Sequence, residues 1–403
     1  MLTAVPRIRV LFFAECVTLA HRARPAVLAH ALDQTHYEVV FATDGRYDTL
    51  FPNFQGRREE IFTISSEQFM AALAKGAPVY DQATLTRYVE DDLALIDRVK
   101  PDLIVGDFRL SLSVSARLSR VPYVALSNLY WSPFAVQRYT VPELPLTRVL
   151  GVSLAQAVFD FARPIAFALH TIPLNRVRRR FGLPSLGSNL GRVYTDADLT
   201  LYADLPDLIR TRPLPPEHKC IGPILWSPDV LSPAWWEAVD EKATLIYVTL
   251  GSSGDVEGLS MLVDALADLP VVLIIATAGR WAPKGPQENV LCADFLPGLA
   301  AARRASVVIC NGGSPTTAQA LAAGTPVIGI PSNLDQYLNM AGIERAGAGV
   351  TLRSGRLKAK GVRSTVQMLL DDPCYRQRAD TLRQKIEAMP SEQLFAESLS
   401  TLI

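Results

Sequence analysis

Residues 295–336 read FLPGLAAARRASVVICNGGSPTTAQALAAGTPVIGIPSNLDQ, and this stretch decides the fold of the second half of the chain. An apolar run, Ser306–Cys310, leads into the glycine turn Asn311–Thr317 and then into an Ala/Leu-rich segment. This order predicts a buried parallel strand, a tight turn and a helix over 316–323. A second apolar run, Thr325–Ile330, predicts the next parallel strand.

The glycine turn is a candidate phosphate site. Its backbone N–H groups can approach an anion closely, and the positive end of the following helix attracts negative charge. Many α/β proteins use two glycines only to join a strand to a helix, so the turn by itself leaves both interpretations open. Asp335 and Gln336 follow the next strand. Because ligands bind at the carboxyl ends of parallel strands, we expect this pair and the turn to face one cleft.

These residues resemble the donor motif of nucleotide-sugar-dependent glycosyltransferases with the two-domain GT-B fold, a group that includes plant secondary-metabolite and bacterial macrolide enzymes. That motif runs from aromatic-x-Pro-Gln through a His-x-Gly-x-x-(Ser/Thr) turn and a later Glu to Asp-Gln. The resemblance places an aromatic ring under the base, the turn on the diphosphate and the Asp-Gln pair on sugar hydroxyls. With the turn after the strand 244–250, the candidate donor-binding residues are Ser252, Phe295, Asn311, Gly312, Gly313, Ser314, Thr316, Gln319, Asp335 and Gln336.

Two positions depart from the family pattern. Asn311 stands where the family has His, and Gln319 stands where it has a ribose-binding Glu. Asn can donate a hydrogen bond to phosphate but never carries a positive charge. Gln accepts from a ribose hydroxyl more weakly than a carboxylate does. We therefore expect a UDP- or dTDP-sugar as co-substrate, without deciding between the two.

The first half contains a candidate acid–base pair. Arg9–Ala14 is predicted to be a strand and Pro25–Ala31 the following helix, with His21 where the intervening loop meets that helix. A later strand, 101–107, ends at Asp107, on the same edge of the sheet. An aspartate can fix the tautomer of a histidine that accepts a proton. The family resemblance supports His21 as general base and Asp107 as its orienting partner, although His21 alone could simply cap or pack.

Two further stretches concern the acceptor. Trp131 and Phe134 lie in a loop after a predicted strand, where aromatic side chains either line an acceptor pocket or pack at the edge of the core. The apolar stretch Val149–His170 favours buried helices, then a lid over the acceptor, then a patch that touches a membrane surface. Because charged residues and Pro164 interrupt it, we expect no stable membrane insertion, with peripheral contact left open.

The length, charge and cysteine content of the chain limit the classes of protein to which it can belong. A chain of 403 residues favours two domains, and 40 basic against 40 acidic residues give no reason to expect a nucleic-acid partner. Five scattered cysteines indicate neither a disulfide framework nor a zinc site, so we expect a cytoplasmic protein without a metal. The expected division is an acceptor-binding domain 1–215, a proline-rich linker 216–243, a donor-binding domain 244–389 and a helix 390–403 that packs back on the first domain.

The resemblance covers nearly the whole chain and implies α/β architecture: two Rossmann-like domains facing across a cleft. It implies an inverting, metal-independent hexosyltransferase. Such an enzyme transfers the sugar of a nucleotide sugar to a small hydrophobic acceptor, such as a natural product or a lipid-like molecule. Alternatives are a nucleotide-sugar epimerase or hydrolase on the same fold, or a non-catalytic auxiliary homologue that binds nucleotide sugars. A monomer and a homodimer are both compatible with the sequence.

Overall fold

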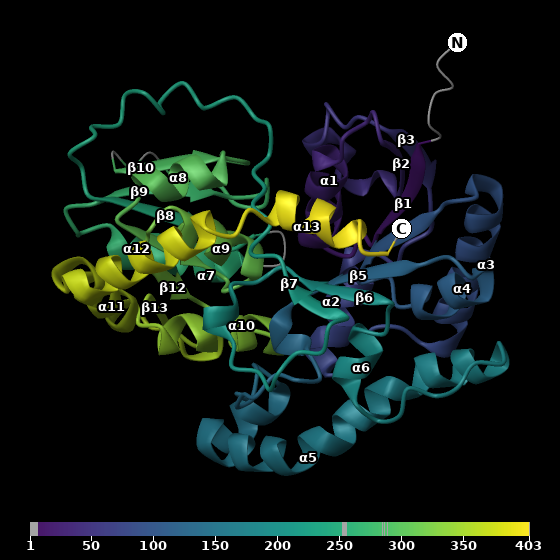
Figure 1. Ribbon diagram of the computed structural model, residues 1–403. Coiled ribbons are helices and arrows are strands. Elements are labelled where there is room, and N and C mark those ends of the chain that lie inside the picture. The colour runs from purple at the N-terminus through teal and green to yellow at the C-terminus, as the bar shows by residue number, and fades with distance from the viewer. Residues whose placement is uncertain (1–6, 252–255, 284, 286, 288, 403) are drawn as a thin grey trace. The chain divides into compact units, whose positions relative to one another are not determined.

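The computed structural model describes residues 7–402 except 252–255, 284, 286 and 288, so the candidate Ser252 lies outside the described residues. By their internal contacts the residues form two α/β units (Figure 1). Unit 1 comprises Met1–Gln137, Val158–Ile224 and Pro390–Ile403, and unit 2 comprises Arg138–Ala157 and Leu225–Met389. Each unit is built on one parallel sheet, which confirms the predicted fold class.

The sheet of unit 1 has seven parallel strands in the order β3-β2-β1-β4-β5-β6-β7. The order reverses between β1 and β4, and such a switch point is where open parallel sheets bind ligands. The central strands are apolar and buried on both faces, as expected for a sheet covered by helices. The strands are β1 (Ile8–Ala14), β2 (Tyr37–Thr43), β3 (Arg57–Glu60), β4 (Leu103–Asp107), β5 (Tyr123–Ser127), β6 (Leu199–Tyr202) and β7 (His218–Cys220).

The sheet of unit 2 has six parallel strands in the order β10-β9-β8-β11-β12-β13, with its switch point between β8 and β11. The predicted turn 311–317 therefore follows a strand at the switch point. The strands are β8 (Leu245–Thr249), β9 (Val272–Ala276), β10 (Val290–Ala293), β11 (Val307–Cys310), β12 (Val327–Gly329) and β13 (Gly349–Thr351).

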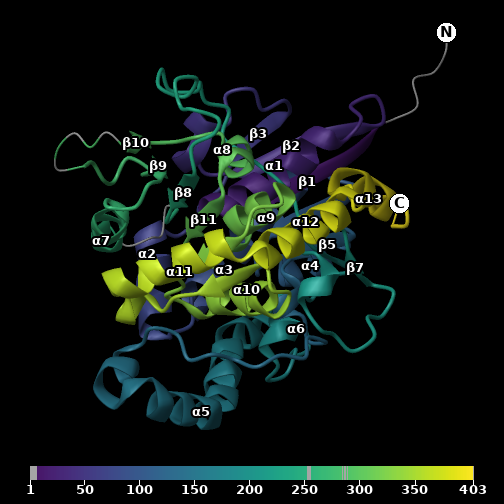
Figure 2. The same cartoon turned by 90° about the vertical axis from the view of Figure 1, so that its left-hand side faces the viewer.

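Helices cover both sheets. In unit 1 they are α1 (Leu19–Ala31), α2 (Ser66–Lys75), α3 (Gln82–Val99), α4 (Leu112–Ser119), α6 (Leu190–Tyr194) and α13 (Ser391–Leu399). In unit 2 they are α7 (Val256–Leu266), α8 (Gly298–Arg304), α9 (Ser314–Ala322), α10 (Leu334–Arg345), α11 (Ala359–Asp371) and α12 (Pro373–Glu387). Helix α11 packs on α7, and α12 packs on α9 (Figure 2). Helix α5 (Pro145–Arg180) contributes residues to both units.

Helix α1 starts earlier than the sequence predicts. The prediction placed Pro25 at the first helical turn, but the helix begins at Leu19 and contains Pro25. Proline lacks the N–H that would bond to the carbonyl four residues earlier, which is that of His21. Packing of α1 on β1 and β4 outweighs this lost bond, and His21 consequently lies within the first turn of the helix.

The observed boundaries of the two units differ from the expected domains. Residues 138–157 belong to unit 2, where Glu143 pairs with Arg353 at 2.7 Å and accepts a hydrogen bond from Tyr337 at 2.8 Å. The expected linker contains β7, which pairs with β6 in unit 1, so unit 1 runs to Ile224. The terminal helix α13 belongs to unit 1 and packs on α1.

Helix α5 overturns the leading interpretation of the apolar stretch 149–170. That interpretation expected buried helices, but only 6 % of the most apolar 18-residue segment of α5 is buried. The helix is kinked at Gly151, which has a φ of +72°. Among the described residues, α5 is the one helix long and apolar enough to cross a membrane by length and composition. Core helices of soluble proteins pass the same test, so this property alone assigns no membrane span.

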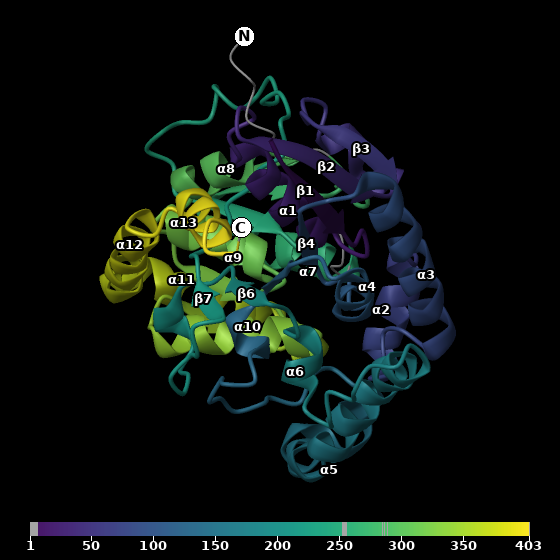
Figure 3. The same ribbon diagram turned by 45° about the vertical axis from the view of Figure 1, so that its right-hand side comes forward.

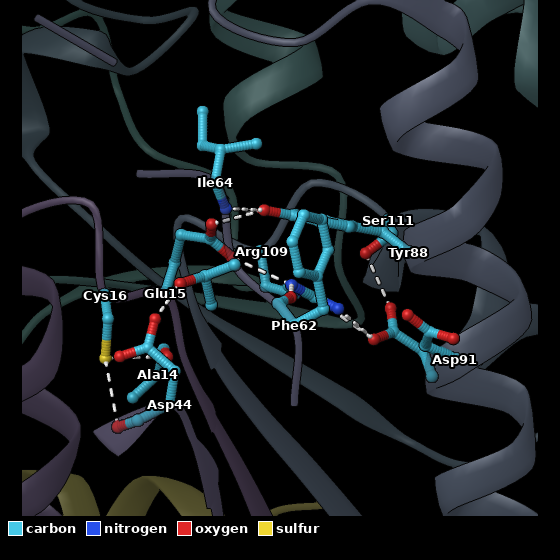
Figure 4. A network of polar contacts seen from close by, with 12 residues as sticks. Ala14, Glu15, Cys16, Asp44, Phe62, Ile64, Tyr88, Asp91, Arg109 and Ser111 are labelled. Carbon is cyan, nitrogen blue, oxygen red and sulfur yellow. Dashed lines mark hydrogen bonds and ion pairs between the residues drawn. The ribbon is translucent and has the colours of Figure 1, made fainter. Parts of the chain in front are cut away.

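A buried ion network holds the loop after β1 in unit 1 (Figure 4). Arg109 donates to Glu15 at 3.0 Å and to Asp92 at 2.9 Å, and all three side chains are fully buried. Burial raises the pKa of both carboxyl groups, and the Arg109 guanidinium opposes this effect. Tyr88 donates to Glu15 and accepts from the backbone N–H of Ile64. The network thus ties the end of β1 to α3 and to the chain near residue 64.

Candidate active site

His21 and Asp107 meet at the switch point of unit 1. The distance from His21 Nδ1 to Asp107 Oδ1 is 2.8 Å; the Asp107 side chain is fully buried and the His21 side chain is 18 % exposed. The acid lies at the end of β4 and the histidine in the first turn of α1, which follows β1. When the Nδ1–H of His21 donates to Asp107, the second ring nitrogen, Nε2, can accept a proton from a substrate. The geometry therefore suits a general base.

Arg24 is a third member of this group that the sequence reasoning missed. Its Nε and Nη2 each donate to one oxygen of Asp107 at 2.7 Å, and its Nη1 donates to Asn128 Oδ1 at 2.8 Å. Burial alone would raise the pKa of Asp107, but the Arg24 guanidinium and His21 outweigh it and lower that pKa. Asp107 is therefore held as an anion beside His21. The available signal was spacing, because residues 21 and 24 share a helix face.

Phe108 connects His21 to a pocket. The two rings stack with centroids 4.8 Å apart and planes 14° apart. Phe108 has φ +58°, a left-handed conformation that is costly for a bulky residue and that persists only where surrounding structure enforces it. Phe108 also lines a small pocket that is partly open to solvent. The other lining residues include Tyr80, Leu110, His170, Leu174 and Tyr194.

The two predicted acceptor residues lie in different surroundings. Trp131 packs edge-on against Tyr194, with ring centroids 5.3 Å apart, so it supports a residue of the pocket wall. Phe134 packs against His218 at 5.1 Å. Neither Trp131 nor Phe134 is among the residues that line the pocket. Residues that line the pocket come from α5, from α6 and from the segment around Tyr80.

The predicted donor turn follows β11 in unit 2. Gly312 has φ +79°, and a Cβ there would come within 2.8 Å of Met340 Cγ, so this position requires glycine. Asn311 Oδ1 accepts from the backbone N–H of Gly313 at 3.0 Å. Helix α9 then begins at Ser314, and its N-cap residue, Gly313, offers no side-chain cap. N–H groups at the start of α9 are thus left without a side-chain cap, an arrangement suited to an anion.

Asn339 holds this turn in place and was not predicted. Its Nδ2 donates to the carbonyl of Gly312 and to Thr317 Oγ1, both at 2.8 Å. The residue comes from α10, the helix that also contains Asp335, so α10 contacts the glycine turn directly. No local sequence signal marks Asn339, because its partners lie 22 or more residues away.

The remaining donor candidates have structural contacts of their own. Gln319 Nε2 donates to the backbone carbonyl of Trp226, and Gln319 is 8 % exposed. Gln336 forms a capping box with Asn333 at the start of α10, and its Oε1 accepts from the Ser332 N–H at 2.8 Å. Asp335 lies in the first turn of α10, and both Asp335 and Phe295 are partly buried. Thr316 is in the first turn of α9.

Comparison with known proteins decides the family. Residues 260–402 match the family model described as "Erythromycin biosynthesis protein CIII-like, C-terminal domain". Over 378 residues the chain is 50 % identical to a "PGL/p-HBAD biosynthesis glycosyltransferase" of Mycobacterium tuberculosis, which covers 94 % of this chain and 88 % of the relative. The chain belongs to the GT-B nucleotide-sugar glycosyltransferases.

Two further matches agree with the GT-B glycosyltransferase family. A "PGL/p-HBAD biosynthesis rhamnosyltransferase" of Mycobacterium bovis is 51 % identical over 379 residues, covering 94 % of this chain and 84 % of the relative. The solved structure "Spinosyn Rhamnosyltransferase SpnG complexed with thymidine diphosphate" superposes with a TM-score of 0.70 at 20 % identity, covering 98 % of this chain and 100 % of the other. This GT-B enzyme is therefore a glycosyltransferase, and the family recognised from the donor motif is confirmed.

Proposed function

We propose that this enzyme transfers a sugar, with inversion, from a pyrimidine nucleoside diphosphate sugar to a hydroxyl group of an aromatic, lipid-like acceptor. The observation that carries the proposal is a series of contacts: Asp107 is hydrogen-bonded to His21, His21 stacks on Phe108, and Phe108 lines the pocket. A base and an aromatic pocket lie together within unit 1. The names of the mycobacterial relatives support a lipid-like product class.

The proton step uses His21. The acceptor oxygen attacks the anomeric carbon while its proton passes to His21 Nε2, and the bond from that carbon to the diphosphate oxygen breaks. The resulting imidazolium is stabilised by the adjacent Asp107 carboxylate. Arg24 positions that carboxylate through two hydrogen bonds at 2.7 Å. The proton therefore comes to rest on His21, and the electron pair leaves with the diphosphate.

The leaving diphosphate is assigned to the turn after β11. Backbone N–H groups at the start of α9, with the hydroxyls of Ser314 and Thr316, stabilise the charge that develops as the bond breaks. The complex of a structural neighbour with thymidine diphosphate supports a pyrimidine nucleotide. The Gln319 amide donates to a backbone carbonyl here, so we assign ribose recognition to its oxygen only. No metal is assigned to the step.

The acceptor class follows from the pocket wall. The aromatic residues Phe108, Tyr194 and Tyr80 and the aliphatic residues Leu110 and Leu174 line this pocket. Aromatic rings pack well on such walls through offset or edge-on contacts. A phenolic hydroxyl, with a pKa of about 10, is more acidic than an aliphatic hydroxyl, so its proton passes to an imidazole at a smaller free-energy cost. We therefore assign a phenol-type acceptor with an apolar substituent.

Gly313→Asp should abolish donor binding. The position has ordinary backbone geometry, and a Cβ there would lie 3.2 Å from Asn311 Oδ1, so a side chain can be accommodated by a small shift. A carboxylate at this helix start repels a diphosphate, and like-charge juxtaposition of this kind costs several kcal/mol, or about 100-fold or more in affinity. Gly313→Asn is the matched control, because it has the same shape without the charge.

Calorimetric titration with UDP, dTDP, GDP and ADP, with and without Mg²⁺, measures this effect. We expect one pyrimidine diphosphate to bind the parent without metal, the Asn variant to bind it at reduced affinity and the Asp variant to lose it. If no nucleotide binds the parent, the assignment of the donor diphosphate to this turn fails. Release of free sugar from the donor, with or without a phenol, would instead identify a hydrolase.

A further inference from the structure

The outer face of α5 in unit 1 carries an apolar stripe. Val158, Phe161, Ile165 and Leu169 are 39 %, 83 %, 61 % and 53 % exposed. They recur at intervals of three and four residues, so they lie on one side of the helix. Scattered exposed apolar residues are normal, but a contiguous stripe of large ones marks an interaction surface.

The opposite face of the same helix is fixed to unit 1. His170, Pro173 and Leu174 line the pocket next to Phe108. Buried Arg178 donates to the Ser113 carbonyl at 2.7 Å and pairs with Asp196 at 2.8 Å. In Figures 1 and 3 no other described element of unit 1 lies on the side of α5 that faces away from the sheet of unit 1. The stripe is therefore presented outward by a helix that is anchored along its inner side.

The C-terminal end of α5, which follows the stripe, is basic. Residue 176 lies seven positions after Leu169, on the same face, and Arg176, Arg179 and Arg180 are all exposed. Between residues 158 and 180 there are five arginines and one acidic residue, Asp160, in a chain whose formal net charge is zero. Apolar side chains followed by exposed basic ones are characteristic of helices that lie in the interface of an anionic bilayer.

We propose that this outer face of α5 docks the enzyme on an anionic lipid surface. Phe161, Ile165 and Leu169 enter the boundary between headgroups and acyl chains, and the arginines contact lipid phosphates. Basic residues near an anionic bilayer are attracted to it, so the basic end gives the stripe its preference for anionic lipid. The helix lies along the membrane and does not cross it, because its inner face remains packed on unit 1. Docking itself needs neither the donor nor the acceptor.

Sedimentation with vesicles tests the proposal in the absence of any substrate. We expect the parent to sediment with vesicles of phosphatidylcholine and phosphatidylglycerol and much less with phosphatidylcholine alone. The triple variant Phe161→Ser, Ile165→Ser, Leu169→Ser should lose at least about tenfold in binding, and Arg176→Glu with Arg179→Glu should lose the preference for phosphatidylglycerol. Leu231→Ser is the matched control, because Leu231 is 95 % exposed in unit 2.

Failure of the parent to sediment, or equal sedimentation of the triple variant, would overturn the proposal. So would a parent dimer that the triple variant dissociates in light scattering, since a second copy would then cover the stripe. A circular dichroism spectrum like that of the parent establishes that the variants fold. Turnover with a water-soluble phenol should be unchanged in the triple variant, while turnover with a vesicle-embedded acceptor falls; this separates docking from the proposed chemistry.

Discussion

His21→Ala should lower the turnover number by about 10²–10⁴-fold, the usual contribution of a positioned general base. The variant removes the nitrogen that accepts the acceptor proton, and it leaves the Arg24–Asp107 pair intact at 2.7 Å. Nucleotide affinity should be unchanged, because the proposed phosphate turn belongs to unit 2. Initial rates with a saturating phenol acceptor, together with calorimetric titration of the nucleotide, measure both quantities.

His36→Ala is the matched control for the histidine substitution. His36 is exposed and pairs only locally with Asp33, so its removal should leave turnover at the parent level. Parent-like turnover of His21→Ala would reject the general-base role. A loss of nucleotide affinity equal to the loss of turnover would show that His21 supports donor binding instead.

Arg109→Leu should lower the free energy of unfolding by about 3–5 kcal/mol, because it leaves Glu15 and Asp92 buried without their cation. Both carboxyl groups already have raised pKa values caused by burial, and the variant removes the group that opposes this rise. Denaturant unfolding followed by fluorescence, compared at several pH values, measures the loss. Low pH should reduce the loss, since protonation neutralises the unpaired acids.

A second arginine provides the control for Arg109→Leu. Arg117 pairs with Asp196 at 2.8 Å, and its side chain is 33 % exposed, so Arg117→Leu should cost only about 0–1 kcal/mol. Adding Glu15→Gln and Asp92→Asn to Arg109→Leu should recover part of the stability, because no buried charge then remains. Equal losses for the two arginine variants would contradict the interpretation of the network as buried and charged.

Much of the fold is visible in the sequence, because parallel strands buried on both faces leave uninterrupted apolar runs. The ends of β1 and β4 follow from such runs, and they place His21 beside Asp107. The position of the glycine turn is visible for the same reason, since its glycines follow the run that forms β11. Features that local sequence rules describe well were therefore predicted well, within a few residues at the boundaries.

The missed features depend on contacts between distant residues. In the sequence, nothing distinguishes Arg24 from other basic residues in helices. Only tertiary packing brings it to Asp107, which lies 83 positions away. Helix α1 keeps Pro25 inside it because packing on the sheet overrides the local rule. Helix α5 reads as core because it is apolar, and composition cannot distinguish an apolar face that is buried from one that is exposed. The capping box of Asn333 and Gln336 is a local feature, since Asn followed three residues later by Gln is a typical helix start.

Neither compact unit is a continuous piece of the chain, and this matters for anyone who recombines such enzymes. A gene cut near residue 224 would separate α13 from α1 and would leave residues 138–157 without Arg353 and Tyr337. A hybrid that combines unit 1 of one enzyme with unit 2 of a relative would therefore need all three segments of unit 1 from the same parent. The chain's route between the units sets where crossover points between homologous genes can fall.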